Sequence, residues 1–448
     1  MPRMSPRPRR SSRSGPAGPT FLVEEAARPS GGPLAEQLRA FRWRGGPTTV
    51  GRTAVRLETG DALGVDTFVN EFWTSRQRAA HSLHEISYRA CFKPQLPRFF
   101  IERLTAPGAV VYDPFAGRGT TLLEAALLGR VPAGCDVNPL SAMLIAPRLA
   151  PPTVEQVASR LAAVDFTRVD ERPDDLLVFF HPDTLREIGA LKRWLLRRQE
   201  DGTLDDVDRW IRMVGVNRLT GHSPGFFSVY SLPPNQAPSI ASQRKINAAR
   251  AQVPPRRDVP ALILAKTRSL LADCDAATRA RLDAAGRNAR LLTGTADRTP
   301  ALASASVDLV VTSPPFLDVV NYAADNWLRC WFCGIDPAGV PLTVVRRPGA
   351  WQASMTAVFH EMARVLAPGG FVAFEVGEVR GGRLHLEEIV IPCGVAAGLQ
   401  PRLVVINTQQ FTKTANIWGV ANNRRGTNTN RIVVFEKAHG TAAPRPVA

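Results

Sequence analysis

Two acidic residues that flank a glycine-rich turn are the first feature of the sequence that could do chemistry. Asp113 ends a short apolar run, and residues 113–121 read Asp-Pro-Phe-Ala-Gly-Arg-Gly-Thr-Thr. Gly117 and Gly119 carry no side chain, so the backbone can approach a ligand closely, and the N-terminus of a following helix would offer free N–H groups to a carboxylate. Asp136 ends the next apolar run, 23 residues further on, which suits an acid that accepts hydrogen bonds from ribose hydroxyls. The turn lacks the Gly-Lys-Ser/Thr ending of a P-loop, which disfavours a nucleoside triphosphatase.

A second candidate site is the run Ser-Pro-Pro-Phe, which directly follows another apolar run. Pro314 and Pro315 fix the backbone and remove two N–H donors, so nearby carbonyl groups remain free to accept hydrogen bonds. Ser313 adds a hydroxyl group, and Phe316 adds an aromatic face. Taken alone, the run could also be an ordinary turn after a strand.

The elements that must position these two turns are predicted from short apolar runs bounded by turn residues. A strand, a helix and a second strand surround the first turn, which predicts a parallel sheet covered by helices. Helices are expected over residues 120–128, 351–366 and 384–397, where apolar residues recur at helical spacing. Seven strands are expected, at residues 109–113, 131–136, 289–294, 307–312, 370–377, 401–408 and 431–437.

Composition and periodicity divide the chain into five parts. We expect a basic, largely disordered N-terminal region over residues 1–60 and a tail over 438–448. Residues 151–288 show helical periodicity without a strong strand and predict a mostly helical insertion. The insertion separates a first half-domain, 61–150, which holds the glycine-rich turn, from a second half-domain, 289–437, which holds the Ser-Pro-Pro-Phe turn.

The chain is strongly basic. It has 448 residues, a formal net charge of +16 at pH 7 and an isoelectric point of about 10.5, which favours a polyanionic partner. Nucleic acid is our first choice, ahead of a membrane surface and a structural RNA role. No apolar run reaches the roughly 18 residues of a transmembrane helix, and residues 1–19 lack the apolar stretch of a secretory signal. We therefore expect a cytoplasmic protein with no membrane partner.

Four segments together resemble the DNA amino-methyltransferases, the N4-cytosine and N6-adenine family. Residues 113–121 are similar to the family's S-adenosylmethionine motif, and residues 91–97, Cys-Phe-Lys-Pro-Gln-Leu-Pro, resemble the motif that precedes it. Residues 136–139, Asp-Val-Asn-Pro, resemble the family's ribose-binding strand end. Residues 313–316 resemble its Ser/Asp/Asn-Pro-Pro-aromatic motif.

The resemblance covers roughly residues 70–145 and 289–437. It implies an α/β fold, a doubly wound Rossmann-like methyltransferase sheet of seven strands whose last strand is antiparallel to the rest. It also implies S-adenosylmethionine as the cofactor and places Asp297, in a Gly-Thr-Ala-Asp run, near the adenine amino group. The residues expected to bind the cofactor are Lys93, Asp113, Pro114, Phe115, Gly117, Gly119, Thr120, Asp136 and Asp297.

The resemblance also implies a mechanism. An aromatic amine is a poor nucleophile because its lone pair is delocalised into the ring, and acceptors for both amino hydrogens favour a pyramidal nitrogen that can attack a sulfonium methyl group. The Ser313 hydroxyl and the Pro314 carbonyl are the proposed acceptors, within a turn that Pro315 stiffens, and Phe316 would stack on the base. Extrusion of the base costs a few kcal/mol, and stacking worth about 1–3 kcal/mol offsets much of it. In the family, Ser at position 313 goes mostly with cytosine, whereas Asp or Asn goes mostly with adenine or with guanine N2 in RNA.

Two stretches without any acid, residues 221–257 and 389–435, predict where DNA would bind. Both are rich in Arg, Lys, Asn and Gln, which suit phosphates and base edges. The first stretch makes the insertion the candidate target-recognition region. The predicted DNA-contacting residues are Arg244, Lys245, Arg250, Arg424 and Arg425.

Cysteine and histidine predict neither a metal site nor a covalent base adduct. Cys330 and Cys333 form a lone Cys-x-x-Cys in an apolar stretch, so two buried thiols are expected. Cys393 follows a proline, as the nucleophile of C5-cytosine methyltransferases does, but it lies in a predicted apolar helix.

These features predict a site-specific methyltransferase that transfers a methyl group from S-adenosylmethionine to N4 of cytosine in double-stranded DNA. A restriction-modification or epigenetic role in a bacterial or archaeal cytoplasm is expected, with a cognate restriction endonuclease as a candidate partner. The alternatives are an N6-adenine DNA methyltransferase, a methyltransferase acting on an RNA base amine, and a DNA-binding regulator whose fold has lost activity.

Overall fold

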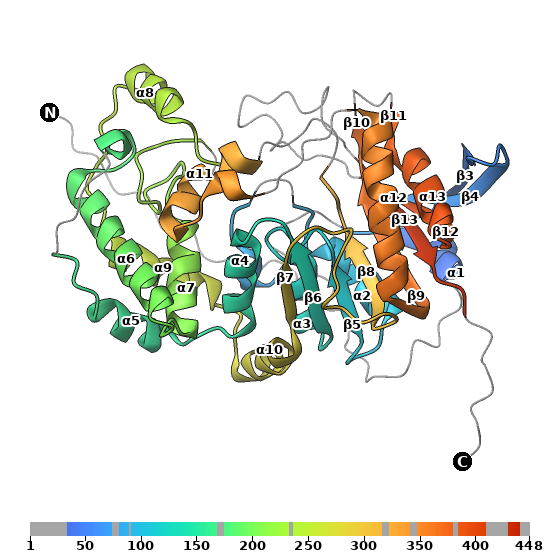
Figure 1. Ribbon diagram of the computed structural model, residues 1–448, viewed down its shortest axis with the longest axis horizontal. Helices are drawn as coiled ribbons and strands as arrows, with labels where there is room; N and C mark the ends of the chain where they lie inside the picture. Colours follow the sequence, from blue (N-terminus) through green and yellow to red (C-terminus); the bar gives the residue numbers. More distant parts are fainter. Residues whose placement is uncertain are drawn as a thin grey trace, which may run out of the picture.

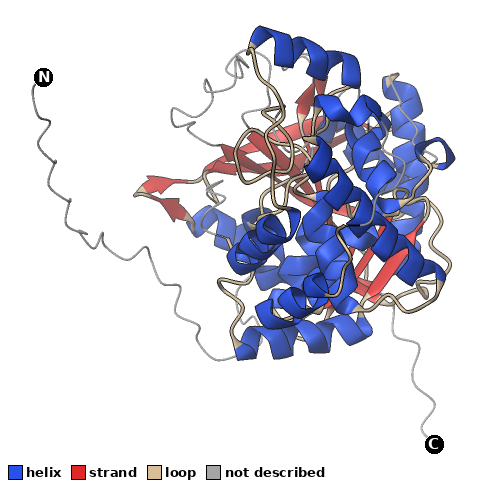
Figure 2. Ribbon diagram, turned by 90° about the vertical axis from the view of Figure 1, so that its left-hand side faces the viewer, coloured by secondary structure: helices blue, strands red, loops and turns tan. Residues whose placement is uncertain are grey.

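The computed structural model describes nine stretches of the chain, residues 34–73, 80–88, 91–167, 174–232, 236–315, 322–340, 347–379, 384–408 and 429–439. A large sheet fills the centre, with helices on both of its faces, and a group of helices extends from one end of it (Figure 1). Seen from that end, helices stand in front of the strands (Figure 2).

The sheet has nine strands in the order β3-β4-β12-β13-β9-β8-β5-β6-β7. The strands from β9 to β7 run parallel, and β13 is antiparallel to both of its neighbours, β9 and β12. The seven strands that we predicted are therefore confirmed, and so is the antiparallel last strand. Their bounds are β5 (Val110–Asp113), β6 (Val131–Asp136), β7 (Arg290–Thr293), β8 (Val307–Thr312), β9 (Leu366–Val376), β12 (Gln400–Thr408) and β13 (Thr429–Glu436).

The N-terminal region corrects our expectation. We expected residues 1–60 to be largely disordered, but from residue 34 onward the chain forms α1 (Leu34–Ala40), a short hairpin and two further strands of the main sheet. The strand β4 pairs in parallel with β12, and β3 pairs with β4 at the edge of the sheet. An edge strand buries little, so β3 lacks the apolar run that would have revealed it. The additional strands are β1 (Arg42–Trp43), β2 (Gly46–Pro47), β3 (Thr49–Arg56) and β4 (Ala62–Asn70).

The two faces of the sheet carry different helices. Side chains alternate between faces along each strand, so Tyr112 packs with the α12 side and Val111 with the α2 side. The predicted helices over 120–128, 351–366 and 384–397 are confirmed. They form α3 (Thr120–Leu127), α12 (Pro348–Val365) and α13 (Leu386–Ala396), and α2 is Gln95–Leu104. Two short strands, β10 (Glu378–Val379) and β11 (Leu384–His385), precede α13.

The insertion is helical, as predicted, and the described residues between 151 and 288 contain no strand of the sheet. Its apolar side chains share one core with α3, α4 and α11. The last of its helices, α10, returns to the sheet and packs against α3, α4 and β6. The helices are α4 (Leu140–Leu149), α5 (Val154–Ala162), α6 (Pro182–Glu200), α7 (Asp206–Val216), α8 (Ile240–Ala249), α9 (Val259–Leu270), α10 (Ala276–Asn288) and α11 (Tyr322–Cys333).

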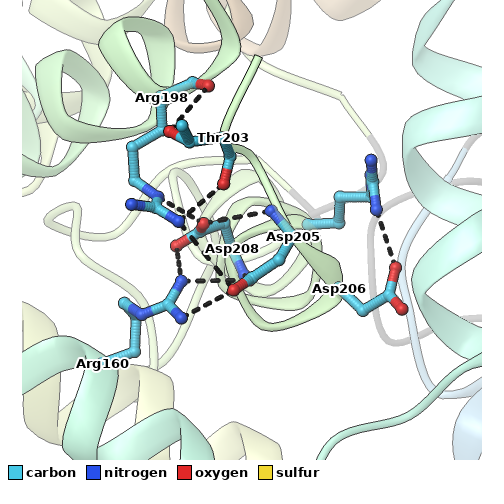
Figure 3. Close-up of polar contacts among 7 residues, drawn as sticks. Arg160, Arg198, Thr203, Asp205, Asp206 and Asp208 are labelled. Carbon is cyan, nitrogen blue, oxygen red and sulfur yellow. Dashed lines mark hydrogen bonds and ion pairs between the residues drawn. The ribbon is translucent and has the colours of Figure 1, made fainter. Parts of the chain in front are cut away.

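A charge network ties three helices of the insertion together (Figure 3). Asp208 on α7 is fully buried, and its carboxylate accepts hydrogen bonds from Arg160 of α5 at 2.5 Å and from Arg198 of α6 at 2.6 Å. Asp205 caps α7 and accepts a second bond from Arg160 at 2.7 Å. The Arg160 hydrogen bond, the largest influence, lowers the pKa of Asp205. Opposite charges are thus matched within the network.

The described helices include none with both the length and the apolar character that crossing a membrane requires.

Candidate active site at the carboxyl edge of the sheet

The predicted site residues meet at one edge of the sheet. The strands β8, β5, β6 and β7 are neighbours and run parallel, so their carboxyl ends lie side by side. Asp113 ends β5 and Asp136 ends β6, while Ser313 follows β8. This is the edge at which parallel α/β sheets bind ligands.

Asp113 is a buried carboxylate without a cationic partner among the described residues. Its Oδ1 accepts hydrogen bonds from the Thr312 hydroxyl at 2.6 Å and from the Phe115 N–H at 3.0 Å. Burial raises the pKa of Asp113 to about 7, and these two bonds offset only part of that rise. Because Thr312 ends β8, the first of these bonds joins the cofactor turn to the strand that carries Ser313.

The glycine-rich turn is fixed by steric demands and by Asp136. Gly119 has φ +75°, and a Cβ there would lie 2.3 Å from a side-chain carbon of Ile145 on α4. Gly119 is therefore required for close helix packing, whereas we had expected it to let the backbone approach a ligand. Gly117, at φ +51°, has open space around it, and its N–H donates to Asp136 Oδ2 at 2.8 Å. Thr120 follows as the first, buried residue of α3, after the buried Pro114 and the half-buried Phe115.

Asp136 connects the ends of β5 and β6. One oxygen accepts from Gly117 and the other accepts from the Asn138 N–H at 2.8 Å. Burial raises the pKa of Asp136, and the two backbone hydrogen bonds oppose that rise. Each carboxylate oxygen can accept more than one hydrogen bond, so both retain capacity for ligand hydroxyl groups.

Lys93 and Asp297 lie at the margins of this edge. Lys93 is half-buried, and burial, with a smaller effect from the charge of Arg118, lowers its pKa. Asp297 is exposed in the turn that follows β7, close enough to the end of β6 for its charge to act on Cys135.

The Ser-Pro-Pro turn holds a residue that our sequence analysis missed. The side chain of Ser313 is hydrogen-bonded to the carboxylate of Glu375, which lies on the neighbouring strand β9. Asn430 of β13 donates its Nδ2 to Glu375 Oε1 at 2.8 Å. Glu375 is buried, and burial raises its pKa. A lone acid within the apolar run Phe-Val-Ala-Phe-Glu-Val was the signal that could have revealed it.

The two prolines differ in their surroundings. Pro314 is buried and Pro315 is exposed. The carbonyl of Pro315 accepts a hydrogen bond from the Trp351 indole at 3.0 Å, which fixes the turn against α12. The predicted stacking residue, Phe316, lies outside the described residues.

The predicted DNA-contacting residues of the insertion lie on the exposed surface of α8 and just beyond it. Arg244 forms an ion pair with Asp175 at 3.0 Å, and the Arg250 guanidinium lies 3.8 Å from the centre of the Tyr230 ring. Lys245 is exposed. Arg424 and Arg425 lie outside the described residues.

The described residues contain no group of three His, Cys, Asp or Glu side chains that could hold a metal ion. Cys330 and Cys333 are buried on α11, and Cys393 is buried on α13. Burial raises the pKa of all three thiols, which opposes formation of a nucleophilic thiolate.

Comparison with known proteins agrees with this geometry over the first half of the site. Residues 57–145 match a family model described as DNA methylase. The Type II methyltransferase M.MjaII of Methanocaldococcus jannaschii is 33% identical over 69 residues, which are 15% of this chain and 13% of that protein. The Type II methyltransferase M.BsoBI of Geobacillus stearothermophilus is 25% identical over 154 residues, 30% of each chain. The chain thus spans less than a third of the length of these relatives.

Among solved structures, a geranyl diphosphate C-methyltransferase from Streptomyces coelicolor A3(2) is 9% identical, with a TM-score of 0.33 over 78% of this chain and 77% of that one. The family model and the two sequence relatives, together with the α/β sheet, support the chain as a member of the DNA amino-methyltransferase family.

Proposed function

We propose that this protein is a site-specific DNA methyltransferase that transfers a methyl group from S-adenosylmethionine to the exocyclic N4 of cytosine. The observation that carries the proposal is the Ser313 side chain, which is hydrogen-bonded to the buried Glu375 beside the rigid Pro-Pro turn. The likeness to DNA methylases supports a base amine as the target. The choice of cytosine over adenine rests on Ser at position 313.

The residues at the edge suit S-adenosylmethionine, which supplies an electrophilic methyl group when it is bound. That molecule carries positive charge, and Asp113 and Asp136 are two buried carboxylates without cationic partners among the described residues. A cation beside a buried carboxylate stabilises its ionised form. Gly117 lies in open space between the two acids, where a ligand can approach. Lys93, Asp297 and the rest of the turn would complete the cofactor site.

Ser313 and Glu375 explain how the target amine could be activated. If the Ser313 hydroxyl donates its proton to Glu375, both lone pairs of its oxygen remain free for one amino hydrogen of the base. The Pro314 carbonyl would accept the other. The nitrogen lone pair then forms a bond to the methyl carbon as the carbon–sulfur bond breaks. The nitrogen gains positive charge and must lose one proton, and a buried carboxyl with a raised pKa, reached through Ser313, suits that proton.

The DNA would extend over the insertion. The exposed surface that carries Arg244, Lys245 and Arg250 is proposed to contact phosphates, although Arg244 must first exchange its exposed partner Asp175. Such an exposed pair contributes little to stability, so the exchange is inexpensive. Simultaneous replacement of the three cations should make the salt dependence of DNA binding less steep by two to three phosphate contacts.

The proposal is tested by the transfer of a labelled methyl group. The protein is incubated with methyl-labelled S-adenosylmethionine and either unmodified duplex DNA or structured RNA. Label in DNA alone is expected. Label in RNA alone would move the proposal to an RNA base amine, and no transfer, with cofactor binding intact, would indicate a regulator without activity.

A further inference from the structure

The short hairpin that precedes the edge strand β3 has an arginine at its tip. The strands β1 and β2 pair Trp43 with Gly46, so Arg44 and Gly45 form a two-residue loop. Both loop residues have positive φ, 48° for Arg44 and 83° for Gly45, which is the primed turn that suits twisted hairpins. Asn or Gly is the favoured first residue of such a turn, and Arg is strained there.

The hairpin is held firmly in place. Asn70, at the end of β4, donates its side-chain amide to the Thr48 hydroxyl at 3.1 Å and to the Gly46 carbonyl at 3.4 Å. Thr48 in turn donates to the Phe41 carbonyl at 3.1 Å. An unfavourable residue at the tip of an anchored turn indicates that its side chain was retained for a purpose other than folding.

The hairpin lies at the same edge of the sheet as the candidate active site. The strand β4 is parallel to β12, and β12 and β9 are each antiparallel to β13, so β4 points the same way as β8. The carboxyl end of β4, Asn70, therefore lies at the edge where Ser313 follows β8. Because Thr49 pairs with Val69, β3 begins at this edge, directly after the hairpin.

The distance along this edge suits duplex DNA. Five strand-to-strand steps separate β8 from β3, which gives about 24 Å at roughly 4.8 Å per step. This is about seven base pairs of DNA at 3.4 Å each. The hairpin and the insertion stand at opposite ends of the sheet (Figure 1), so a duplex centred on Ser313 could reach both.

The charge of the region fits the same partner. Residues 34–56 contain five arginines and one acid, Glu36. Arg44 is exposed, and its guanidinium lies 5.9 Å from the centre of the Trp43 ring. We propose that the Arg44 hairpin is a second DNA-contacting surface, whose arginine binds a backbone phosphate on the side of the target base away from the insertion. This inference rests on the proposed function.

The test uses Arg44→Asn, because Asn suits the positive φ and keeps the turn while the charge is removed. Binding of the full-length protein to a fluorescent duplex about three helical turns long is titrated at several salt concentrations. One lost phosphate contact should make the slope of log K against log salt about 0.9 less negative and weaken binding about eightfold near 0.1 M salt. Thermal unfolding of Arg44→Asn should begin no lower than that of the wild type.

The matched control is Arg56→Gln, at the other end of β3, where Arg56 pairs with Ala62 at the opposite edge of the sheet. It removes the same charge and should leave the slope unchanged. A wild-type slope for Arg44→Asn, or an equal change in the control, would overturn the inference while methyl transfer to DNA still stood. A wild-type protein that binds no duplex would overturn the inference and the proposed function together.

Discussion

Two sets of buried carboxylates lie in different regions of this protein and are treated differently. In the insertion, Asp208 and Asp205 are matched by Arg160 and Arg198, and the pKa of Asp205 is lowered. At the carboxyl edge, Asp113, Asp136 and Glu375 receive only hydroxyl, amide and backbone N–H groups among the described residues, and burial raises the pKa of each.

The difference separates structure from chemistry. A buried acid that is paired with arginine mainly holds helices together, and it is costly to break. A buried acid without a cation destabilises the free protein, so its presence at a ligand-binding edge indicates a task such as cation binding or proton transfer. If this distinction holds, changes in the insertion network should alter stability alone, and changes at the edge should alter binding and turnover.

The largest effect is expected from Asp208→Asn. The substitution leaves two arginine side chains without their buried partner, and the free energy of unfolding should fall by about 3 kcal/mol, at the low end for a buried pair because both arginines are partly exposed. Urea unfolding would measure it. The control is Asp206→Asn in the same turn, whose exposed pair with Arg209 should contribute less than about 1 kcal/mol. Equal losses in both variants would contradict the structural role of the network.

Ser313→Ala should reduce kcat by about a hundredfold, because one of two acceptors for the amine and its link to Glu375 are lost. Steady-state kinetics would measure the loss, and unfolding and cofactor affinity should stay as in the wild type. Glu375→Gln, which keeps the shape of the side chain, should lower kcat and change its pH profile. Full activity in Ser313→Ala would remove this turn from the mechanism.

Asp136→Ala should weaken S-adenosylmethionine binding about tenfold or more, since a charge-assisted hydrogen bond contributes about 1.5–3 kcal/mol. Calorimetric titration would measure the change. An unaltered dissociation constant would place the ribose site elsewhere.

The smallest effect concerns pH. The pKa of Asp113 is raised to about 7 in the folded protein, so the folded state holds this proton more tightly than the unfolded chain does. The stability that this group contributes is therefore full below about pH 4 and is lost as pH rises through about 7. Ionisation should strengthen cofactor binding, by up to about tenfold between about pH 6 and 8. Thr312, the Phe115 N–H and Asp136 also act on this carboxylate, so Asp113→Asn is the variant expected to have a flat profile.

The strands and the glycine-rich turn could be predicted from the sequence because buried parallel strands leave continuous apolar runs. Asp113, Asp136 and Ser313 each end or follow such a run, so their meeting at one edge followed from the direction of the strands. Glu375 could not be assigned in this way, because nothing in a single apolar strand shows which neighbour a lone acid will face.

The edge strand β3 and its hairpin were missed for a related reason. Most side chains of β3 are exposed, and hydrophobic patterning reveals only what is buried. Gly119 was recognised but given a different task, because only the position of Ile145 shows that its missing side chain serves helix packing.

The central claim, that the edge with Ser313 methylates cytosine N4, is tested most directly by the nature of the product. Unmodified DNA treated with the protein and S-adenosylmethionine is digested to nucleosides and analysed by mass spectrometry against methylated standards. N4-methylcytosine is the predicted product, and it should disappear with Ser313→Ala. N6-methyladenine would contradict the assignment of the base while leaving the site in place, and N4-methylcytosine that persists at wild-type rate in Ser313→Ala would contradict the site itself.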